Sequence, residues 1–331
     1  MPVRNEAKFI EPCLAAILAQ EYPEDKLELI VVDGMSDDGT RAIIEKIAMN
    51  DRRIMTIENP RRIAPCAMNL GIGVARGDII FRVDGHAIIP ADYVKECVLW
   101  LSKEQVDGVG GAMDYEMTSY VESAIAACMA SSFGIGGSRF RTTGQKCPHM
   151  VVDTLPFWAF RRAVFDRVGL FNEHMVRHQD YELNYRIRCS GGKLILLPWL
   201  RVRYYVRSTL FKFWSQYWQY GVWKGRFLRM YPASVRARHF VPPLFALALL
   251  ATLLLVLFSP ASGWLCLAWL AGFYALFLGI ATITLAARGY VRQAPLIPLI
   301  LLSLHLLWGT GVWVGILSGK IGKEGKPCVA N

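Results

Sequence analysis

Three long apolar segments near the C-terminus limit what this chain can fold into. They cover residues 241–258, 264–287 and 296–317 and contain no Lys, Arg, Asp or Glu. Each approaches the roughly 20 residues that a helix needs to cross the hydrocarbon core of a bilayer. Buried core helices are the alternative, but no remaining domain is large enough to cover three of them. The sequence therefore predicts a membrane domain of two to three apolar helices over 241–318.

Basic and aromatic residues are concentrated directly before these segments. From Leu183 to Phe240 there are twelve Lys and Arg residues and no Asp or Glu, interleaved with Trp, Tyr and Phe. This composition fits anionic lipid headgroups at the cytoplasmic face of a membrane. It also fits nucleic acid, but its position before the apolar segments argues against that partner. We therefore predict an interfacial helix region over 206–240, no nucleic-acid partner and a cytoplasmic N-terminal domain.

The positive-inside rule does not settle the number of spans. Arg288 and Arg292, between the second and third segments, agree with a cytoplasmic N-terminal domain. The three lysines of the basic tail, 319–331, would lie on the opposite side if all three segments crossed the membrane. The third segment is then either re-entrant or an exception to the rule, and both alternatives stay open.

Residues 1–205 alternate strand-like and helix-like segments. The predicted strands cover 26–33, 77–84, 107–113 and 192–198, and the predicted helices cover 6–20, 39–48 and 64–77. This alternation is typical of an α/β domain with a mostly parallel sheet flanked by helices. Only Met1, Pro2 and Val3 precede the first polar loop, so we expect a truncated first strand or, more in keeping with an intact sheet, an initiation site further upstream.

Carboxylates stand at the ends of two predicted strands. Asp33 and Asp84 occupy the carboxyl ends, where α/β sheets bind ligands. His86 follows Asp84 by two residues, which in an extended stretch places both side chains on the same side. Together they could share a divalent cation, and a surface Asp with a solvated His is the alternative.

A third carboxylate, Asp180, lies at the start of a helical pattern over 178–188. An acidic residue there stabilises the positive end of the helix dipole. The same carboxylate could act as a general base towards an acceptor hydroxyl. The sequence alone does not separate these interpretations.

Five ordered motifs resemble those of family 2 glycosyltransferases. They are PVRNE (2–6), VVDGMSDDGT (31–40), NLGIGVARGDIIFRVDGH (69–86), RRAVFDRVGLFNE (161–173) and HQDYELNYRIR (178–188). With the membrane tail, the chain looks most similar to the ExoA-like enzymes of succinoglycan-type exopolysaccharide synthesis. The resemblance implies a GT-A nucleotide-diphospho-sugar transferase fold over 1–205.

The resemblance also implies roles for individual residues. The nucleotide-sugar would be held by Pro2, Val3, Arg4, Asn5, Glu6, Asp33 and Asp84. Asp84 and His86 would bind a divalent metal, Mn2+ or Mg2+, and Asp180 would be the catalytic base. Because His86 stands where the family has a second carboxylate, the site should favour Mn2+.

The acceptor region implied by the resemblance is Asp153, Trp158, Gln219 and Trp223. Trp158 could stack on a sugar, and a place in the core is its alternative. Gln219–Trp223 resembles the QxxRW motif of polysaccharide synthases but has Val222 in place of the arginine. The alternative here is an apolar stripe on a helix that lies in the membrane interface.

The function implied by the resemblance is inverting hexosyl transfer, with glucose as the expected sugar. The donor would be a UDP-sugar and the acceptor a polyprenyl diphosphate-linked saccharide in bacterial exopolysaccharide synthesis. We expect a multi-pass protein of the inner membrane, in contact with lipid and with other assembly proteins. Two alternatives remain. One is a processive synthase, which Val222 argues against. The other is a non-catalytic assembly subunit with a decayed site, suggested by His86 and by Gln179, which stands where the family has an acid beside the base.

Overall fold

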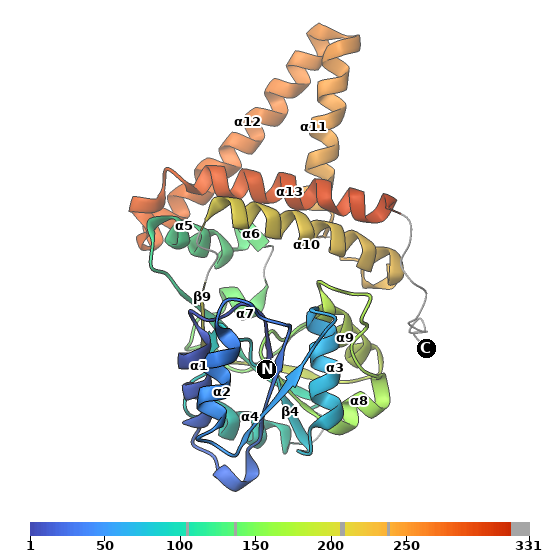
Figure 1. Cartoon of the computed structure of the whole chain (residues 1–331). Helices are drawn as coiled ribbons and strands as arrows, with labels where there is room; N and C mark the ends of the chain where they lie inside the picture. The colour runs from blue at the N-terminus through green and yellow to red at the C-terminus, as the bar shows by residue number, and fades with distance from the viewer. Residues whose placement is uncertain (104–105, 136–137, 206–208, 237–238, 319–331) are drawn as a thin grey trace. The chain divides into compact units, whose positions relative to one another are not determined.

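A computed structural model describes residues 1–103, 106–135, 138–205, 209–236 and 239–318, which form two compact units (Figure 1). The first unit contains 1–116 and 143–205, and the second contains 117–142 together with the helices after Tyr205. The segment 117–142, which the sequence placed in the N-terminal domain, thus groups with the C-terminal helices. The predicted basic tail, 319–331, lies outside the described residues.

The first sheet of the N-terminal unit is parallel and has the order β1 (Pro2–Val3), β2 (Leu29–Asp33), β3 (Ile54–Glu58). In β1, Pro2 pairs with Val32 and Val3 with Asp33, so the first two residues of the PVRNE motif form a short strand. This register brings the start of that loop beside the end of β2.

The second sheet is mixed. Its order is β4 (Ile79–Phe81), β8 (Trp158–Arg161), β6 (Gly108–Glu116), β9 (Leu194–Tyr205), β5 (Ala87–Ile88), and β7 (Met150–Val151) pairs with β9. The β6–β9 pair is parallel and the other pairs are antiparallel. The strand predicted over 77–84 is shorter in the structure and ends at Phe81. Residues 82–86 form the loop between β4 and β5.

Helices flank these sheets. They are α1 (Ile10–Leu18), α2 (Thr40–Ala48), α3 (Ala64–Val74), α4 (Tyr93–Leu101), α8 (Arg162–Val168) and α9 (Gln179–Cys189), with a 3-10 turn η1 (Glu24–Lys26). In α1, Ile10, Cys13, Leu14 and Ile17 are buried, at the helical spacing that the sequence predicts. The core is completed by aromatic side chains, of which Phe157, Trp158 and Phe160 are fully buried.

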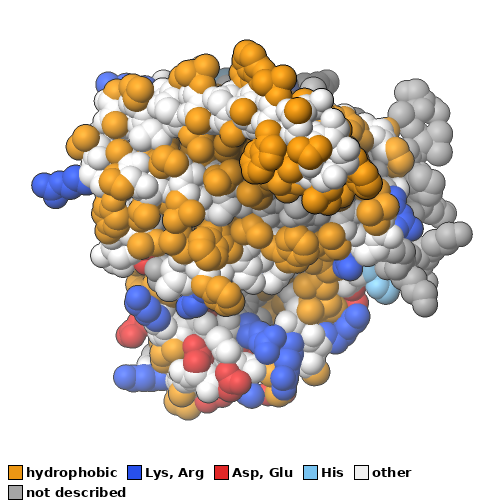
Figure 2. All heavy atoms as spheres, turned by 90° about the horizontal axis from the view of Figure 1, so that it is seen from above, with side chains coloured by type: hydrophobic (Ala, Val, Ile, Leu, Met, Phe, Trp, Pro, Cys, Tyr) orange, Lys and Arg blue, Asp and Glu red, His pale blue; other side chains and the backbone are white. Residues whose placement is uncertain are grey.

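The second unit is helical. It contains α5 (Tyr120–Met129), α6 (Ser132–Ile135), α7 (Arg139–Thr142), α10 (Leu210–Met230), α11 (Val241–Phe258), α12 (Pro260–Leu285) and α13 (Ile297–Leu317), with short turns η2 (Pro232–Ser234), η4 (Ala286–Tyr290) and η5 (Val291–Gln293). Three helical segments, Val241–Phe258, Pro260–Gln293 and Ile297–Leu317, are long and apolar enough to cross a membrane. Apolar side chains cover much of the surface of this unit (Figure 2).

Glycines allow α10 and α13 to approach each other closely. A Cβ atom added at Gly221 would lie 2.4 Å from the carbonyl oxygen of Trp308 and 3.0 Å from the Cα of Gly311. One added at Gly225 would lie 2.1 Å from the carbonyl oxygen of Val312 and 2.9 Å from the Cα of Gly315. Gly221 and Gly225 are four residues apart, as are Gly311 and Gly315, the small-residue spacing that lets two helix backbones meet.

We expect the Gly225→Val variant to lose this packing. Its side chain would overlap the backbone of α13, and overpacking of this kind costs about 3 kcal/mol. The thermal unfolding midpoint of the detergent-solubilised protein should fall by several degrees. Gly272→Val on α12 is the matched control, because a Cβ atom at Gly272 meets nothing within 4 Å. Equal midpoints for the two variants would show that the glycine contact does not hold α10 to α13.

Candidate active site

Arg82, in the loop that follows β4, binds two carboxylates. Its Nε donates to Asp84 Oδ1 at 2.9 Å, and one terminal nitrogen lies 2.8 Å from the same oxygen. Its other terminal nitrogen pairs with Asp180 Oδ2, in the first turn of α9. The Arg82 side chain is buried, whereas Asp84 and Asp180 keep 18% and 22% of their side-chain surface exposed. The buried Arg82 side chain thus holds both carboxylates in place, and part of each carboxylate remains accessible to solvent.

Asp180 is held through both oxygens. The indole Nε1 of Trp158 donates to Asp180 Oδ1 at 3.2 Å, while Arg82 pairs with Oδ2. Burial and the nearby charge of Asp84 raise the pKa of Asp180, and Arg82 acts against them. The helix begins after His178, which adopts φ 61°, a left-handed conformation that costs about 1 kcal/mol or more and is characteristic of functional loops. A positioned carboxylate with a raised pKa is well suited to accept a proton.

His86 lies between two protein side chains. Its Nδ1 is 2.8 Å from Glu6 Oε1 and its Nε2 is 3.0 Å from the Tyr204 hydroxyl. Gly85 makes this close approach feasible, because a Cβ atom there would lie 2.9 Å from Val3 Cγ1 and 3.1 Å from Glu6 Cγ. His86 therefore ties the PVRNE loop to β9.

The PVRNE loop is also tied to the turn after β2. The Asn5 backbone N–H donates to Ser36 Oγ at 2.9 Å, and its side chain donates to Asp37 Oδ1 at 2.9 Å. Asp33 is buried and accepts hydrogen bonds from the backbone N–H of Ser36 at 3.0 Å and from its hydroxyl at 2.5 Å. Arg4 extends from the same loop and is exposed. Pro2–Glu6 and Asp33, predicted from distant motifs, are thus joined through Ser36 into one hydrogen-bonded group.

Of the predicted acceptor residues, Trp158 contacts this cluster, through its hydrogen bond to Asp180. Trp158 is fully buried and stacked on Phe160 at 4.3 Å, so its ring has no face for a sugar and its core alternative applies. Asp153 accepts a hydrogen bond from Arg188 through its backbone carbonyl. Gln219 and Trp223 belong to α10 of the second unit, where the Arg226 guanidinium lies 4.6 Å from the Trp223 ring.

Among the described residues, one carboxylate, that of Asp84, is suited to bind a divalent cation. They contain no group of three His, Cys, Asp or Glu side chains placed to hold a metal. Cations that serve nucleotide diphosphates need less, because one or two carboxylates and the substrate phosphates supply the ligands. Both contacts from Arg82 meet Asp84 Oδ1, which leaves Oδ2 for a cation. His86 fits less well than the sequence predicts, because both its ring nitrogens already have protein partners.

Two residues of this cluster, Arg82 and Tyr204, were not predicted as site residues from the sequence. Arg82 precedes Asp84 by two residues, and in an extended segment that spacing puts the two side chains on the same side. This was a usable signal. Tyr204 meets His86 because β5 pairs with β9, 118 residues further along the chain, and no local pattern indicates that pairing.

Comparison with known proteins agrees with this architecture. Residues 1–169 match the family model described as glycosyl transferase family 2. The chain is 27% identical to the succinoglycan biosynthesis protein ExoA of Rhizobium meliloti (strain 1021), over 96% of this chain and 94% of that protein. It is also 27% identical to the dolichyl N-acetyl-alpha-D-glucosaminyl phosphate 3-beta-D-2,3-diacetamido-2,3-dideoxy-beta-D-glucuronosyltransferase of Methanococcus voltae, over 97% of each chain.

A solved structure with a similar fold matches most of the chain. It is the mannosyltransferase PcManGT from Pyrobaculum calidifontis in complex with GDP-Man and Mn2+, with a TM-score of 0.56 and 22% sequence identity, covering 96% of this chain and 85% of that one. At this identity the likeness shows the fold alone. The predicted fold class, an α/β GT-A domain with C-terminal apolar helices, is confirmed.

Proposed function

Because the chain belongs to glycosyl transferase family 2, we propose that it is an inverting hexosyltransferase with a UDP-sugar donor and a lipid-linked saccharide acceptor. The observation that carries this proposal is the Asp180 carboxylate, fixed through one oxygen by Arg82 and through the other by Trp158 while it stays partly exposed. A carboxylate that is held in one orientation and is still partly exposed can accept a proton from a bound substrate, which a purely structural ion pair would not require.

Asp180 is the general base of the proposed reaction. It takes the proton from an acceptor hydroxyl, and that oxygen forms a bond to the anomeric carbon of the donor sugar. The bond between the anomeric carbon and the nucleoside diphosphate breaks, and the diphosphate leaves with the bonding electron pair. A single displacement of this kind inverts the anomeric centre. Arg82 and Trp158 orient the base and do not themselves exchange protons.

The nucleotide is proposed to bind beside Pro2–Glu6 and Asp33, which the hydrogen bonds of Ser36 with Asn5 and Asp33 hold next to each other. Asp84 faces the donor diphosphate. A divalent ion bound at Asp84 Oδ2 would stabilise the negative charge on the leaving group. His86 shapes this region by holding Glu6 and Tyr204.

The proposed acceptor is a saccharide carried by a polyprenyl diphosphate. Two relatives that match nearly the whole chain are named for succinoglycan biosynthesis and for transfer to a dolichyl-linked sugar phosphate. A sugar carried on a long lipid is presented at a membrane surface, which fits the three apolar helices after the catalytic unit. We place the protein in the cytoplasmic membrane as a multi-pass protein, with the catalytic unit in the cytoplasm, where nucleotide-sugars occur. UDP-glucose is the proposed donor and exopolysaccharide assembly the proposed context.

The test is sugar transfer by membranes that contain the protein. A panel of UDP-sugars is supplied with a lipid extract as acceptor and with Mn2+, Mg2+ or EDTA. The proposal expects one donor, UDP-glucose, to label the lipid fraction and free UDP to appear in equal amount. Turnover of a different donor would correct the sugar but keep the reaction, whereas no transfer from any donor would favour the non-catalytic assembly subunit.

We expect the metal requirement to depend on Asp84 far more than on His86. In Asp84→Asn the Mn2+ concentration that gives half-maximal transfer should rise at least about tenfold, because the carboxylate is the ligand for the cation. His86→Gln should lower the rate but leave that concentration within about twofold, because its two partners are protein groups. A metal titration of both variants decides this, and a similar increase in the two would return His86 to the metal site.

A further inference from the structure

The hairpin formed by α11 and α12 is held by the rest of its unit at the start of α11 and along the C-terminal half of α12, where the Tyr274 hydroxyl lies 2.8 Å from His305 Nδ1. The buried residues of α11 are Pro243 and Ala246, in its first two turns. In α12, Ala281 and Leu285 are buried near the C-terminal end, and Gly263 packs against α11 near the tip. Both helices rise away from α10 and α13 (Figure 1).

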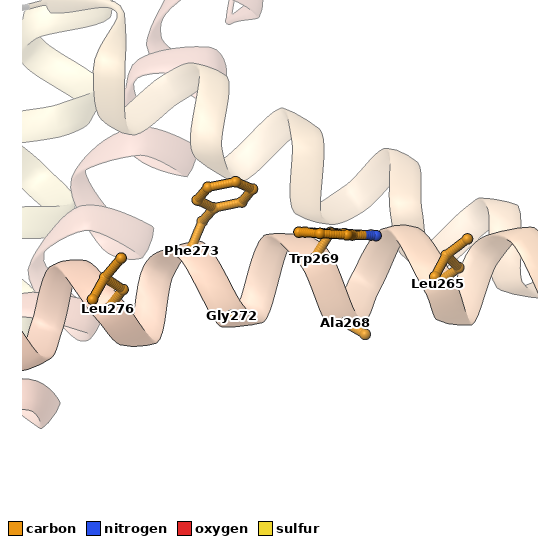
Figure 3. A pocket seen from close by; sticks show the side chains of 6 residues that line it. All are labelled: Leu265, Ala268, Trp269, Gly272, Phe273 and Leu276. Carbon is orange, nitrogen blue, oxygen red and sulfur yellow. The ribbon is translucent and has the colours of Figure 1, made fainter.

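The remaining surface of the hairpin is apolar on all sides. Residues 241–287 include no charged side chain, and large apolar side chains such as Leu257 and Phe273 are exposed. Along one face of α12, a shallow hollow is lined by Leu265, Ala268, Trp269, Gly272, Phe273 and Leu276 (Figure 3). An exposed apolar surface of this extent is stable where acyl chains cover it.

The third apolar helix, α13, behaves differently. Over an apolar stretch of 18 residues in each segment, 44% of the residues are buried inside the protein in α13, against 11% in α11 and 6% in the segment that contains α12. Its buried residues run from Ile297 to Gly315, over nearly its whole length. The apolar composition of α13 therefore serves contacts within the protein, whereas that of the hairpin does not.

α13 lies alongside α10 from one end to the other (Figure 1). Near their starts, Trp214 Nε1 donates to Ser303 Oγ at 2.9 Å. Gly221 and Gly225 meet Gly311 and Gly315 further along. At their ends a terminal nitrogen of Arg229 donates to the carbonyls of Ile316 and Ser318, at 3.3 and 3.1 Å. The two helices are parallel neighbours and must lie at the same depth in a membrane.

α10 cannot cross a bilayer at low cost. It carries Lys212 in its first turn and Lys224, Arg226 and Arg229 in its last two turns. Each cation at the centre of a bilayer costs about 2.5–3.5 kcal/mol. Exposed Phe211 and Trp218 on the same helix fit the boundary between headgroups and acyl chains. α10 thus belongs in the interface, and α13, its neighbour along its length, belongs there too.

We propose that α11 and α12 are the two membrane-spanning helices and that α13 lies in the headgroup layer beside α10. Only three residues separate Tyr205 of the catalytic unit from Thr209, the residue that caps α10, so α10 lies on the same side of the membrane as that unit. Two spans bring the chain back to this side. Arg288 and Arg292, between α12 and α13, and the lysines that follow α13 in the sequence all fall on that side. The conflict with the positive-inside rule disappears.

The tip of the hairpin reaches the opposite headgroup layer. The 18 residues of α11 extend about 27 Å, close to the roughly 30 Å of the hydrocarbon core. Only Ser259 separates α11 from α12, and the first backbone N–H groups of a helix have no partner within it. Leaving such groups in hydrocarbon costs several kcal/mol each, whereas water can satisfy them. Exposed Trp264 beside the tip fits an interfacial position.

Accessibility of single cysteines tests this topology in the full chain. Cys147, Cys189, Cys266 and Cys328 are first replaced by serine. Three reporters are then compared: Cys189 restored, Ser259→Cys at the tip of the hairpin, and Ser318→Cys at the end of α13. Each is treated with a membrane-impermeant maleimide in intact spheroplasts and in inside-out vesicles. The remaining cysteines react little, because burial raises the pKa of Cys13 to about 12 and of Cys66 to about 11.

We expect Cys189 and Ser318→Cys to react at least tenfold faster in inside-out vesicles, and Ser259→Cys to react faster in spheroplasts. Three full spans predict the opposite for Ser318→Cys, which would then react together with Ser259→Cys, and that result overturns the proposal. Reaction of Ser259→Cys only after detergent is added would mean that the hairpin does not cross, and it overturns the proposal as well. The measurement does not depend on the proposed activity.

Discussion

Asp180→Asn is expected to lose about 10³-fold of the transfer rate, within the range that a general base contributes. The amide keeps the shape of the side chain and can still accept from Trp158, but it cannot take a proton from the acceptor hydroxyl. The measurement is the rate of sugar transfer at saturating donor, together with the affinity for UDP. Affinity should change little, because Asp180 acts on the acceptor and not on the nucleotide.

Asp166→Asn is the matched control. Asp166 is an exposed carboxylate on α8 of the same unit, so its replacement removes the same charge from the surface of the same domain. It should keep the wild-type rate. If both variants transfer sugar normally, Asp180 is not the base, and its contacts with Arg82 and Trp158 are structural.

The fold of the N-terminal unit could be predicted where the pattern is local. The apolar run that ends in Asp33 indicates a strand, and the spacing of Ile10, Cys13, Leu14 and Ile17 indicates a helix; both are found. The pairing of β4 with β8 and of β5 with β9 joins segments that lie far apart in the sequence. Such pairing depends on tertiary packing, which a local pattern does not contain.

The candidate site divides in the same way. Asp33, Asp84 and Asp180 could be found because each marks a strand end or a helix start. Their environments could not, since Arg82 bridges two carboxylates that are 96 residues apart and Tyr204 reaches His86 across a strand pair. The metal role expected of His86 depended on residue type and spacing, and the contacts of its ring nitrogens weaken it.

The membrane segments show the limit of composition. α13 has the length and hydropathy of a span, yet one side of it is buried against α10 and the neighbouring helices along nearly its whole length. The signal that separates it was present as glycines four residues apart in both segments, Gly221 with Gly225 and Gly311 with Gly315. That spacing identifies helices that pack on each other, whereas hydropathy identifies only what lipid would tolerate.

Arg82→Met should shift the pH dependence of transfer. Burial and Asp84 raise the pKa of Asp180, and Arg82 opposes both, so removal of the guanidinium raises that pKa further. Because the active form needs an ionised Asp180, the rate falls as pH decreases through its pKa. The acidic limb of the pH profile should therefore move to higher pH by about one unit, which corresponds to about 1.4 kcal/mol. On the acidic limb itself this shift makes transfer about tenfold slower at a given pH.

Arg82→Lys separates an electrostatic role from a structural one. Loss of one partner from a buried ion pair costs about 3–5 kcal/mol, so Arg82→Met could reduce the amount of folded protein. The lysine keeps the positive charge but cannot reach both carboxylates with the geometry of a guanidinium. We expect it to restore most of the acidic limb and only part of the rate. If Arg82→Met slows transfer equally at every pH while the lysine variant matches it, then Arg82 supports the loop between β4 and β5 and does not set the ionisation of Asp180.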